Sequence, residues 1–260
     1  MALRYAGRAC QTQYKDGDRH NPLTEADEAL DHFLQQAFQQ AFPHDGWLSE
    51  ETADDGSRYQ KDRCWVVDPI DGTSAFLRWL STDMPTDQDD QDRRQFSISI
   101  ALVEGGVPVL GLVYAPLRHQ LFHAIKGKGL FCNNQPVVRG KAPTDLGDCV
   151  YLSSVRETEA GLLDGLTDHM QLRPLGSVAY KLALTAVTPQ AVTASLKRKS
   201  RWDVAAGDLL CREAGLLVTD LRGDALDYTR DKTSYNGLVA APAHLHEQLL
   251  GVLPALAKGY

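Results

Sequence analysis

Residues 65–73 read Trp65-Val66-Val67-Asp68-Pro69-Ile70-Asp71-Gly72-Thr73, a short apolar strand followed by two carboxylates, a proline, a glycine and a hydroxyl. The valines predict a strand that ends at Asp68. Pro69 fixes one φ angle and removes a hydrogen-bond donor, and Gly72 allows a sharp turn. Both carboxylates can then converge on one cation. Carboxylate oxygens suit Mg²⁺ or Mn²⁺ rather than zinc, and Mg²⁺ usually completes its shell with water and substrate phosphate oxygens, so the segment indicates phosphate chemistry.

The same residues are also consistent with an ordinary turn, because Asp, Pro and Gly are common turn formers. Two distant segments favour the metal site. They are Leu48-Ser49-Glu50-Glu51 upstream and Trp202-Asp203-Val204-Ala205-Ala206-Gly207 downstream. The three segments together are far more specific than any one of them alone.

Length and composition are those of a soluble globular protein. The chain has 260 residues, of which 43% are hydrophobic and 23% charged, enough for one large domain or two small ones. No apolar run approaches the ~20 residues that span a bilayer, and the start lacks the apolar core of a secretory signal. We therefore expect a cytoplasmic protein with no membrane partner.

The cysteine spacing and the net charge argue against several kinds of site and partner. The five cysteines are widely spaced without a Cys-x-x-Cys pair, which disfavours zinc sites and a disulfide framework. A net charge of −7 argues against a nucleic-acid polymer as partner, because such binding needs a basic surface. A small phosphorylated substrate remains compatible, since bound cations would neutralise its phosphate.

Periodicity predicts mixed α and β structure. A helix is expected over residues 29–42, with Thr24 as its N-cap and Asp27 as the capping-box partner. The other predicted helices and strands, placed by their apolar spacing, are helices at 177–187, 204–213 and 244–253 and strands at 96–103, 107–114, 121–125, 216–219 and 237–241. The acidic segment 81–94 is expected to be a solvated loop or a lid beside the site.

The three quoted segments resemble the inositol monophosphatase superfamily of metal-dependent phosphatases. Its members share a Glu-Glu segment, then Asp-Pro-(Ile/Leu)-Asp-Gly-Thr, then Trp-Asp followed by small residues, and each block is present here in that order. Further matches begin near residue 20 and include 22–27, 97–102, 111–116, 127–129 and 237–242.

The resemblance implies a mixed α/β fold of stacked α-β-α-β-α layers, of the inositol monophosphatase and fructose-1,6-bisphosphatase type. We expect a single phosphatase domain over residues 1–260. Its pseudo-halves would be an α+β half at about 1–145 and an α/β half at 146–260, with the metal site between them. A homodimer is left open, because dimers are common in the family.

The resemblance also implies the metal ligands. They are the carboxylates of Glu50, Asp68, Asp71 and Asp203 and the backbone carbonyl of Ile70, holding two or three Mg²⁺ ions, with Mn²⁺ as a substitute. Such ions neutralise the phosphate, lower the pKa of a bound water and stabilise the leaving oxygen. Asp203 is equally placed to cap the helix near Val204, and the two roles are compatible.

The remaining catalytic assignments follow the same resemblance. Glu50 and Thr73 are expected to hold and activate the attacking water, although Thr73 could simply close the turn. Asp27, with Thr24, matches a pair that orients this water in the bisphosphate nucleotidase branch, or else forms a plain capping box. The N–H groups of Gly72 and Thr73 are expected to face the phosphate. Ser177 is a further expected phosphate or substrate contact.

The segment before Asp203 bears on the substrate. Inositol monophosphatases proper carry a Glu shortly before the Trp-Asp aspartate that contacts sugar hydroxyls, and here Leu196 stands at that position. Lys197 and Arg198 follow, and they are either solvated or pair with a second phosphate. The second option favours 3′-phosphoadenosine 5′-phosphate, and the segment 46–52 is similar to bacterial 3′(2′),5′-bisphosphate nucleotidases.

Three functions therefore stay open. The leading expectation is removal of the 3′-phosphate of 3′-phosphoadenosine 5′-phosphate by a metal-activated water. The alternatives are a phosphatase of inositol or another sugar or polyol phosphate, and a regulatory or binding member with little turnover. The intact set of carboxylates argues against the last of these, because a purely regulatory protein need not keep them.

Overall fold

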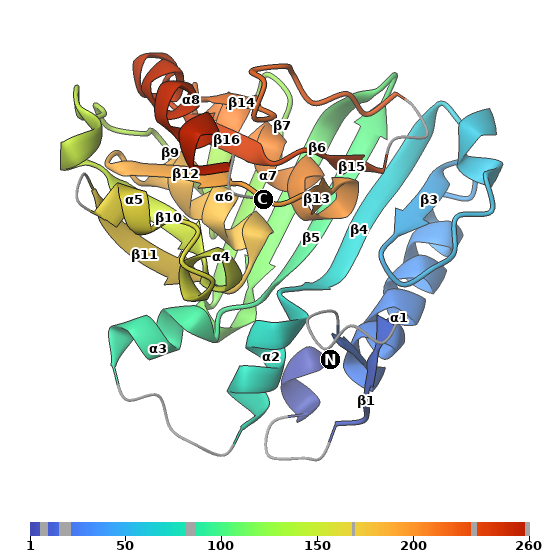
Figure 1. Ribbon diagram of the computed structural model, residues 1–260. Coiled ribbons are helices and arrows are strands. Elements are labelled where there is room, and N and C mark those ends of the chain that lie inside the picture. The colour runs from blue at the N-terminus through green and yellow to red at the C-terminus, as the bar shows by residue number, and fades with distance from the viewer. Residues whose placement is uncertain (6–9, 16–21, 82–86, 168–169, 230–232, 258–260) are drawn as a thin grey trace.

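The computed structural model describes residues 1–5, 10–15, 22–81, 87–167, 170–229 and 233–257. Within these ranges two sheets alternate with helices in α-β-α-β-α layers, which confirms the expected fold (Figure 1). The helices in chain order are α1 (Glu25–Ala41), α2 (Thr73–Leu80), α3 (Gln88–Arg93), α4 (Val155–Glu159), α5 (Asp164–Thr167), α6 (Val178–Val187), α7 (Arg201–Glu213) and α8 (Ala243–Ala257). None of the described helices is long and apolar enough to cross a membrane.

The larger sheet contains Asp68 and Asp71, which both lie on its strand β4 (Arg63–Asp71). In the described ranges it has seven strands in chain order: β3 (Gly46–Ser49), β4 (Arg63–Asp71), β5 (Ser97–Glu104), β6 (Val107–Ala115), β7 (Gln120–Ile125), β8 (Leu130–Cys132) and β9 (Gln135–Val137). Only the β3–β4 pair is parallel, and the other neighbouring pairs are antiparallel. The β5–β6 hairpin and the following strand β7 confirm the antiparallel strands predicted from the sequence.

The smaller sheet lies on the other side of α6 and α7. Its described strands, in the spatial order β11-β10-β12-β16-β14, are β10 (Val150–Ser154), β11 (Gln171–Leu175), β12 (Ala191–Ser195), β14 (Leu217–Thr219) and β16 (Leu238–Ala241). Two short pairs complete the strands: β1 (Thr12–Tyr14) with β2 (Pro22–Thr24), and β13 (Lys199–Ser200) with β15 (Ser234–Tyr235). Short 3₁₀ turns occur at η1 (Ala2–Tyr5), η3 (Ser57–Gln60), η4 (Pro116–Arg118) and η5 (Leu146–Asp148).

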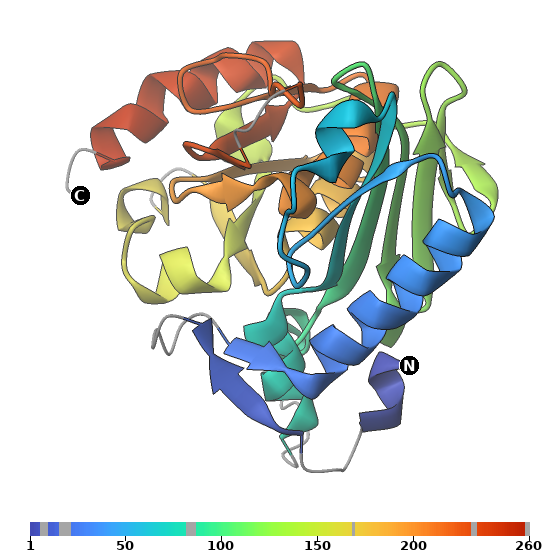
Figure 2. The same ribbon diagram turned by 90° about the vertical axis from the view of Figure 1, so that its right-hand side faces the viewer.

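Three apolar layers hold the sheets and helices together. Helix α1 packs Leu34 and Phe38 on the outer face of the larger sheet, against Trp65 and Val67 (Figure 2). Helices α6 and α7 fill the space between the sheets, where the core contains residues of both sheets. Helix α8 covers the outer face of the smaller sheet. The layering brings the end of β4 and the start of α7 to one side of the molecule.

The acidic segment 81–94 differs from the solvated loop expected from its composition. Residues 87–94 contain α3, whose N-cap is Asp87. Asp92 is buried and accepts hydrogen bonds from Arg173 on β11 and from Arg118. A buried carboxylate held by two guanidinium groups anchors the helix to the smaller sheet. The acidic residues of this segment also include Asp83, which lies outside the described residues.

Candidate active site

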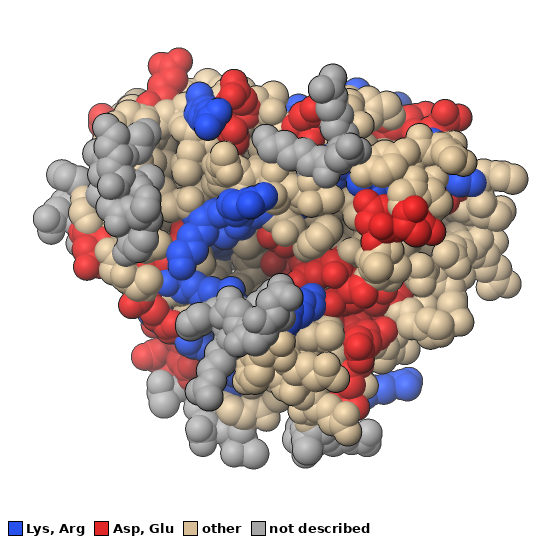
Figure 3. All heavy atoms as spheres, turned by 45° about the vertical axis from the view of Figure 1, so that its right-hand side comes forward, with Lys and Arg blue, Asp and Glu red and all other residues tan. Residues whose placement is uncertain are grey.

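A cavity of about 540 Å³ opens where β4, α2, α4 and α7 come together. Figure 3 shows acidic and basic side chains on opposite sides of this hollow. One side, here called the acidic side, consists of Glu50, Asp68, Asp71 and Asp203. The other, here called the basic wall, consists of Arg78, Arg93, Arg156, Arg198 and Lys199.

A β-bulge explains how Asp68 and Asp71 both reach the cavity. Residues three apart on a regular strand point to opposite faces. On the partner strand, however, Asp68 pairs with Ser99 and Asp71 with Ser97, so β4 has one residue more than β5 between the two pairs. The extra residue restores the same facing for both aspartates. Pro69 lies in this bulge, where its missing N–H costs no ladder hydrogen bond.

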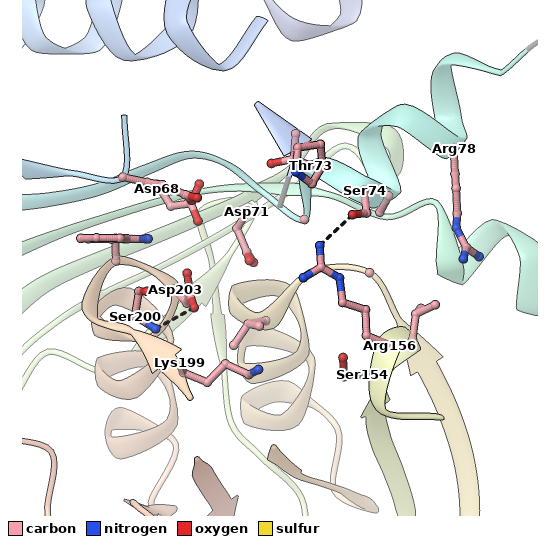
Figure 4. Close-up of a pocket in the computed structure, with 18 of the residues that line it drawn as sticks. Asp68, Asp71, Thr73, Ser74, Arg78, Ser154, Arg156, Lys199, Ser200 and Asp203 are labelled. Carbon is pink, nitrogen blue, oxygen red and sulfur yellow. Dashed lines mark hydrogen bonds between the residues drawn. The ribbon is translucent and has the colours of Figure 1, made fainter. Parts of the chain in front are cut away.

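Three carboxylates of the acidic side form a compact cluster. One oxygen each from Glu50, Asp68 and Asp203 lie within 4.8 Å of one another. Burial raises the pKa of Asp203 to about 8, and the charges of Asp71 and Glu50 add to the shift. Burial likewise raises the pKa of Asp68 well above its ordinary value, with further contributions from Glu50 and Asp71. In Figure 4 the labelled aspartates of this side converge on one space.

Asp71 lines the same cavity but is held from behind. Its Oδ2 accepts hydrogen bonds from the Ser177 hydroxyl and from the N–H of Ala179, 2.6 Å away. Ser177 is fully buried as the N-cap of α6 and also bonds Ser97 at 2.8 Å. Its side chain therefore supports Asp71 instead of lining the cavity, which corrects the expectation of a direct substrate contact. The other oxygen of Asp71 stays available to the cavity.

Asp203 was expected to be the N-cap of its helix, and this expectation is wrong. Helix α7 begins earlier than predicted, with Ser200 as its N-cap, and Asp203 is the third residue of the helix. Its Oδ2 accepts the Ser200 N–H at 2.9 Å, which closes a capping box. The capping box fixes the side chain with one oxygen, so that Asp203 can still contribute to the carboxylate cluster.

Glu50 follows directly after β3 and forms an ion pair with Lys15. The ammonium of Lys15 lies 3.0 Å from Glu50 Oε1 and 2.7 Å from Glu51 Oε2. Burial and the charge of Glu50 raise the pKa of Glu51 to about 7. The buried carboxylate of Asp31 accepts hydrogen bonds from Ser49 and Thr52, on either side of this pair. Neither Lys15 nor Asp31 belongs to a motif, so sequence reasoning missed both.

Thr73 and Asp27 lie together beside the acidic side. The Thr73 hydroxyl is 3.3 Å from Asp27 Oδ1 and 3.2 Å from the Ile70 carbonyl oxygen. Asp27 is also the capping-box partner of Thr24, as predicted. Burial raises its pKa to about 6. Thr73 lines the cavity and Asp27 does not, so Asp27 contacts the cavity through the threonine.

Gly72 forms the N-cap of α2 with a φ of 93°. A Cβ at this position would lie 2.9 Å from the carbonyl oxygen of Gly176, so a larger residue would force the two segments apart. The first N–H groups of a helix have no partner within it. Those of α2 begin at Thr73, which lines the cavity.

The basic wall differs in part from the cluster predicted from the sequence. Arg198 lines the cavity as expected, but Lys197 does not, and Lys199 takes its place. Arg156 reaches across from α4 and donates to the Ser74 hydroxyl at 2.9 Å (Figure 4). Arg156 was missed because the sequence around it carries no recognisable motif, and only the fold brings α4 to the site.

The residues present fit a hard divalent cation. All the clustered donors are carboxylate oxygens, the ligand type that Mg²⁺ prefers. Among the described residues, the buried Asp68 Oδ1 accepts no hydrogen bond. A buried, unpaired carboxylate oxygen is costly unless a cation or a proton satisfies it. The raised pKa values of Asp68 and Asp203 have the same cause, namely burial beside like charges.

Comparison with known proteins shows the family to which the chain is similar. Residues 1–257 match the inositol monophosphatase family. The chain is 32% identical to a histidinol-phosphatase of Mycobacterium tuberculosis, over 90% of this chain and 85% of the relative. It is 30% identical to Nus factor SuhB of Pasteurella multocida, over 100% and 97%. The structure of Thermotoga maritima IMPase superposes with a TM-score of 0.80 at 25% identity, covering 99% of this chain and 92% of that one.

Proposed function

The chain belongs to the inositol monophosphatase family and is a phosphatase, and from this premise we propose that it hydrolyses a phosphate monoester with Mg²⁺. The ligands are Glu50, Asp68, Asp71, Asp203 and the Ile70 carbonyl, for two or three ions, with Mn²⁺ as a substitute. The supporting observation is the group of three carboxylates within 4.8 Å. When bound, the cations neutralise the phosphate and lower the pKa of the attacking water.

Thr73 and Glu50 hold that water on the acidic side. The Thr73 hydroxyl has one proton, and Asp27 Oδ1 at 3.3 Å and the Ile70 carbonyl at 3.2 Å are the acceptors within its reach. Donation to either one turns a lone pair of the hydroxyl toward the cavity, where it can accept a hydrogen bond from the water. Asp27 thus acts by orienting Thr73. The N–H groups of Gly72 and Thr73 bind phosphate oxygens at the start of α2.

The substrate carries a second anionic group, and the leading candidate is 3′-phosphoadenosine 5′-phosphate, from which the 3′-phosphate is removed. The basic wall supports this choice. Arg198, Lys199 and Arg156 line the cavity opposite the carboxylates, and guanidinium groups bind phosphate strongly through paired hydrogen bonds. A polyol such as inositol offers hydroxyls to such a wall, and histidinol phosphate offers a cationic group, so both fit it less well.

A comparison of kcat/KM tests the proposal. We expect Mg²⁺-dependent phosphate release to be most efficient with 3′-phosphoadenosine 5′-phosphate, also called adenosine 3′,5′-bisphosphate. Inositol 1-phosphate and histidinol phosphate should be hydrolysed less efficiently. Asp71→Asn serves as the inactive control, because it removes the charge while its amide oxygen can still accept the Ala179 N–H. Circular dichroism should show this variant folded. An advantage for inositol 1-phosphate would contradict the substrate, and activity retained by Asp71→Asn would contradict the ligand set.

A further inference from the structure

Glu157 is a buried carboxylate of α4 with no part in the chemistry described so far. It is 1% exposed. Its Oε1 accepts the backbone N–H groups of Leu196 and Lys197, both at 3.1 Å. The ammonium of Lys199 lies 3.8 Å from the same oxygen. One carboxylate oxygen thus holds three groups of a single short segment.

The segment held by Glu157 carries part of the basic wall. Residues 196–198 connect β12 to β13, and α7 begins immediately after β13. Arg198 and Lys199 line the cavity. Two consecutive backbone N–H groups bonded to a buried acceptor fix the path of the connection and hence the directions in which these two side chains leave it.

The negative charge of Glu157 makes this anchor stronger than a neutral acceptor would. Hydrogen bonds to a carboxylate are about twice as strong as those between neutral groups. The buried ammonium of Lys181, itself 1% exposed, lies near enough for the charge of Glu157 to favour its protonated form. The two nearby lysines reduce the penalty of burying this carboxylate, whose Oε2 has no hydrogen-bond partner among the described residues.

The residues beside Glu157 on α4 include Arg156, which belongs to the basic wall, and Glu159, which forms ion pairs with two other arginines of that wall. Arg156 donates to Ser74 at the start of α2. Glu159 forms ion pairs with Arg78 at 2.8 Å and with Arg93 at 3.2 Å. These two pairs are partly exposed and contribute little by themselves. Glu157 is the buried member of the set, and so the one whose removal should displace its partners most.

We propose that Glu157 is a positioning residue for substrate specificity. By holding residues 196–199 it places Arg198 and Lys199 at a fixed separation from the carboxylate cluster, so that they bind the second anionic group of the substrate. This inference rests on the proposed function, because it assigns residues to a group that only a doubly anionic substrate carries. Glu157 does not contact the substrate itself.

Two substrates that differ only in the second phosphate test the inference. Adenosine 3′,5′-bisphosphate and adenosine 3′-phosphate present the same scissile group, and the ratio of their kcat/KM values measures recognition of the 5′-phosphate. We expect Glu157→Gln to lower this ratio about tenfold, the effect of losing one charge-assisted interaction. The loss should come from a higher KM for the bisphosphate, with kcat and the kinetics of adenosine 3′-phosphate unchanged.

The chain offers a matched control in Glu213. This carboxylate also accepts two backbone N–H groups, those of Gly127 and Gly129, both at 2.8 Å. It lies at the opposite end of α7 from Asp203 and does not line the cavity. Glu213→Gln should lower the melting temperature without changing the ratio. Lys199→Met keeps the buried carboxylate and should lower the ratio, and the double variant with Glu157→Gln should lose less than the two separate effects combined.

The outcomes separate the inference from the proposed function. A wild-type ratio near one would overturn the doubly anionic substrate and the role of Glu157 with it. A wild-type preference for the bisphosphate that survives in Glu157→Gln would overturn only the inference. A ratio unchanged in Lys199→Met would do the same, even if Glu157→Gln does not fold.

Discussion

The carboxylates of the acidic side lie close together, an arrangement that is costly for stability in the absence of a cation. Asp68 and Asp71 are buried and Asp203 is partly buried beside them, and the loss of solvent around the three carboxylates raises the pKa of each. Ionised carboxylates in such a place repel each other and lose hydration. A divalent cation would relieve both costs. In the absence of the cation, replacing one of these carboxylates by a neutral residue of similar size should raise the stability of the folded protein.

Asp203→Asn should therefore stabilise the metal-free protein and abolish Mg²⁺-dependent activity. The amide oxygen can still accept the Ser200 N–H that closes the capping box, at 2.9 Å in the wild type, while one of the repelling charges is removed. We expect the melting temperature in EDTA at pH 8 to rise by several degrees, at about 2–4 °C per kcal/mol for a chain of this size. Calorimetry and a phosphate-release assay check the two effects. A lower melting temperature in EDTA would show that repulsion is not the dominant cost.

At this scale, the sequence predicts a site residue when that residue lies in a short motif together with other site residues. Asp68, Asp71 and Gly72 lie within one short motif, so their convergence follows from the turn that they form. Arg156 and Lys15 have no such neighbours, and only long-range packing brings them to the cavity. Ser177 was assigned to the correct region but to the wrong surface, because periodicity does not reveal whether a helix cap faces a cavity or a neighbouring carboxylate.

At the scale of elements, the position of α7 decides the site. A Cβ on Gly111 of β6 would lie 2.7 Å from the carbonyl oxygen of Ala206 on α7. A Cβ on Gly207 of α7 would lie 2.5 Å from the Leu182 side chain on α6. Glycines on two elements thus let α7 pack closely against the larger sheet and against α6. Because α7 also carries Asp203, this packing sets the distance between Asp203 and the strand carboxylates.

Gly111→Ala should displace α7 and weaken metal binding together. We expect a loss of about 1–3 kcal/mol in the free energy of unfolding, the usual cost of overpacking, and a higher Mg²⁺ concentration for half-maximal activity. Denaturant unfolding and a Mg²⁺ titration of activity measure the two. Gly251→Ala on α8 is the control, since a Cβ there meets nothing within 4 Å, and alanine favours a helix. Weakened stability with an unchanged Mg²⁺ titration would show that α7 keeps its place.

Elements with a strong apolar period could be predicted, and those held by charge could not. Helix α1 and the β5–β6 hairpin follow from their spacing, with limits close to those predicted. Helix α3 has the sequence QDDQDR, which has no apolar period. It is stabilised instead by the cap at Asp87, by the Arg93–Asp89 pair at 2.6 Å, and by the buried Asp92. The partners of Asp92 are distant in the chain, so composition alone indicated a loop.

For the whole molecule, the net charge of −7 conceals a cavity with two charged sides. An anionic substrate approaching the chain meets the basic wall on one side and carboxylates on the other. The carboxylate side becomes attractive to phosphate only after cations have bound. The net charge therefore argues against a nucleic-acid polymer as partner but carries no information on a small substrate, because the charges that line the cavity are local and of opposite sign.

The clustered carboxylates should also make the stability of the whole protein depend on pH and metal together. The pKa is raised to about 6 for Asp27, to about 7 for Glu51 and to about 8 for Asp203, in each case mainly by burial. Their ordinary values are 3.8 for Asp and 4.5 for Glu. Between the ordinary and the raised pKa of each group, the folded state binds more protons than the unfolded chain. The free energy of unfolding therefore falls as pH rises through this range.

Two other groups limit the window in which this fall is clearest. Burial lowers the pKa of His246 from 6.5, which makes stability rise with pH below that value. Burial lowers the pKa of Lys181 to about 8, which gives the same opposing trend above pH 8. Between pH 6.5 and 8 the carboxylates dominate. In EDTA we expect the melting temperature to fall by several degrees across this range, and saturating Mg²⁺ should largely remove the fall because the cation replaces the lost protons. A melting temperature that rises with pH in EDTA would contradict the cause assigned to these shifts.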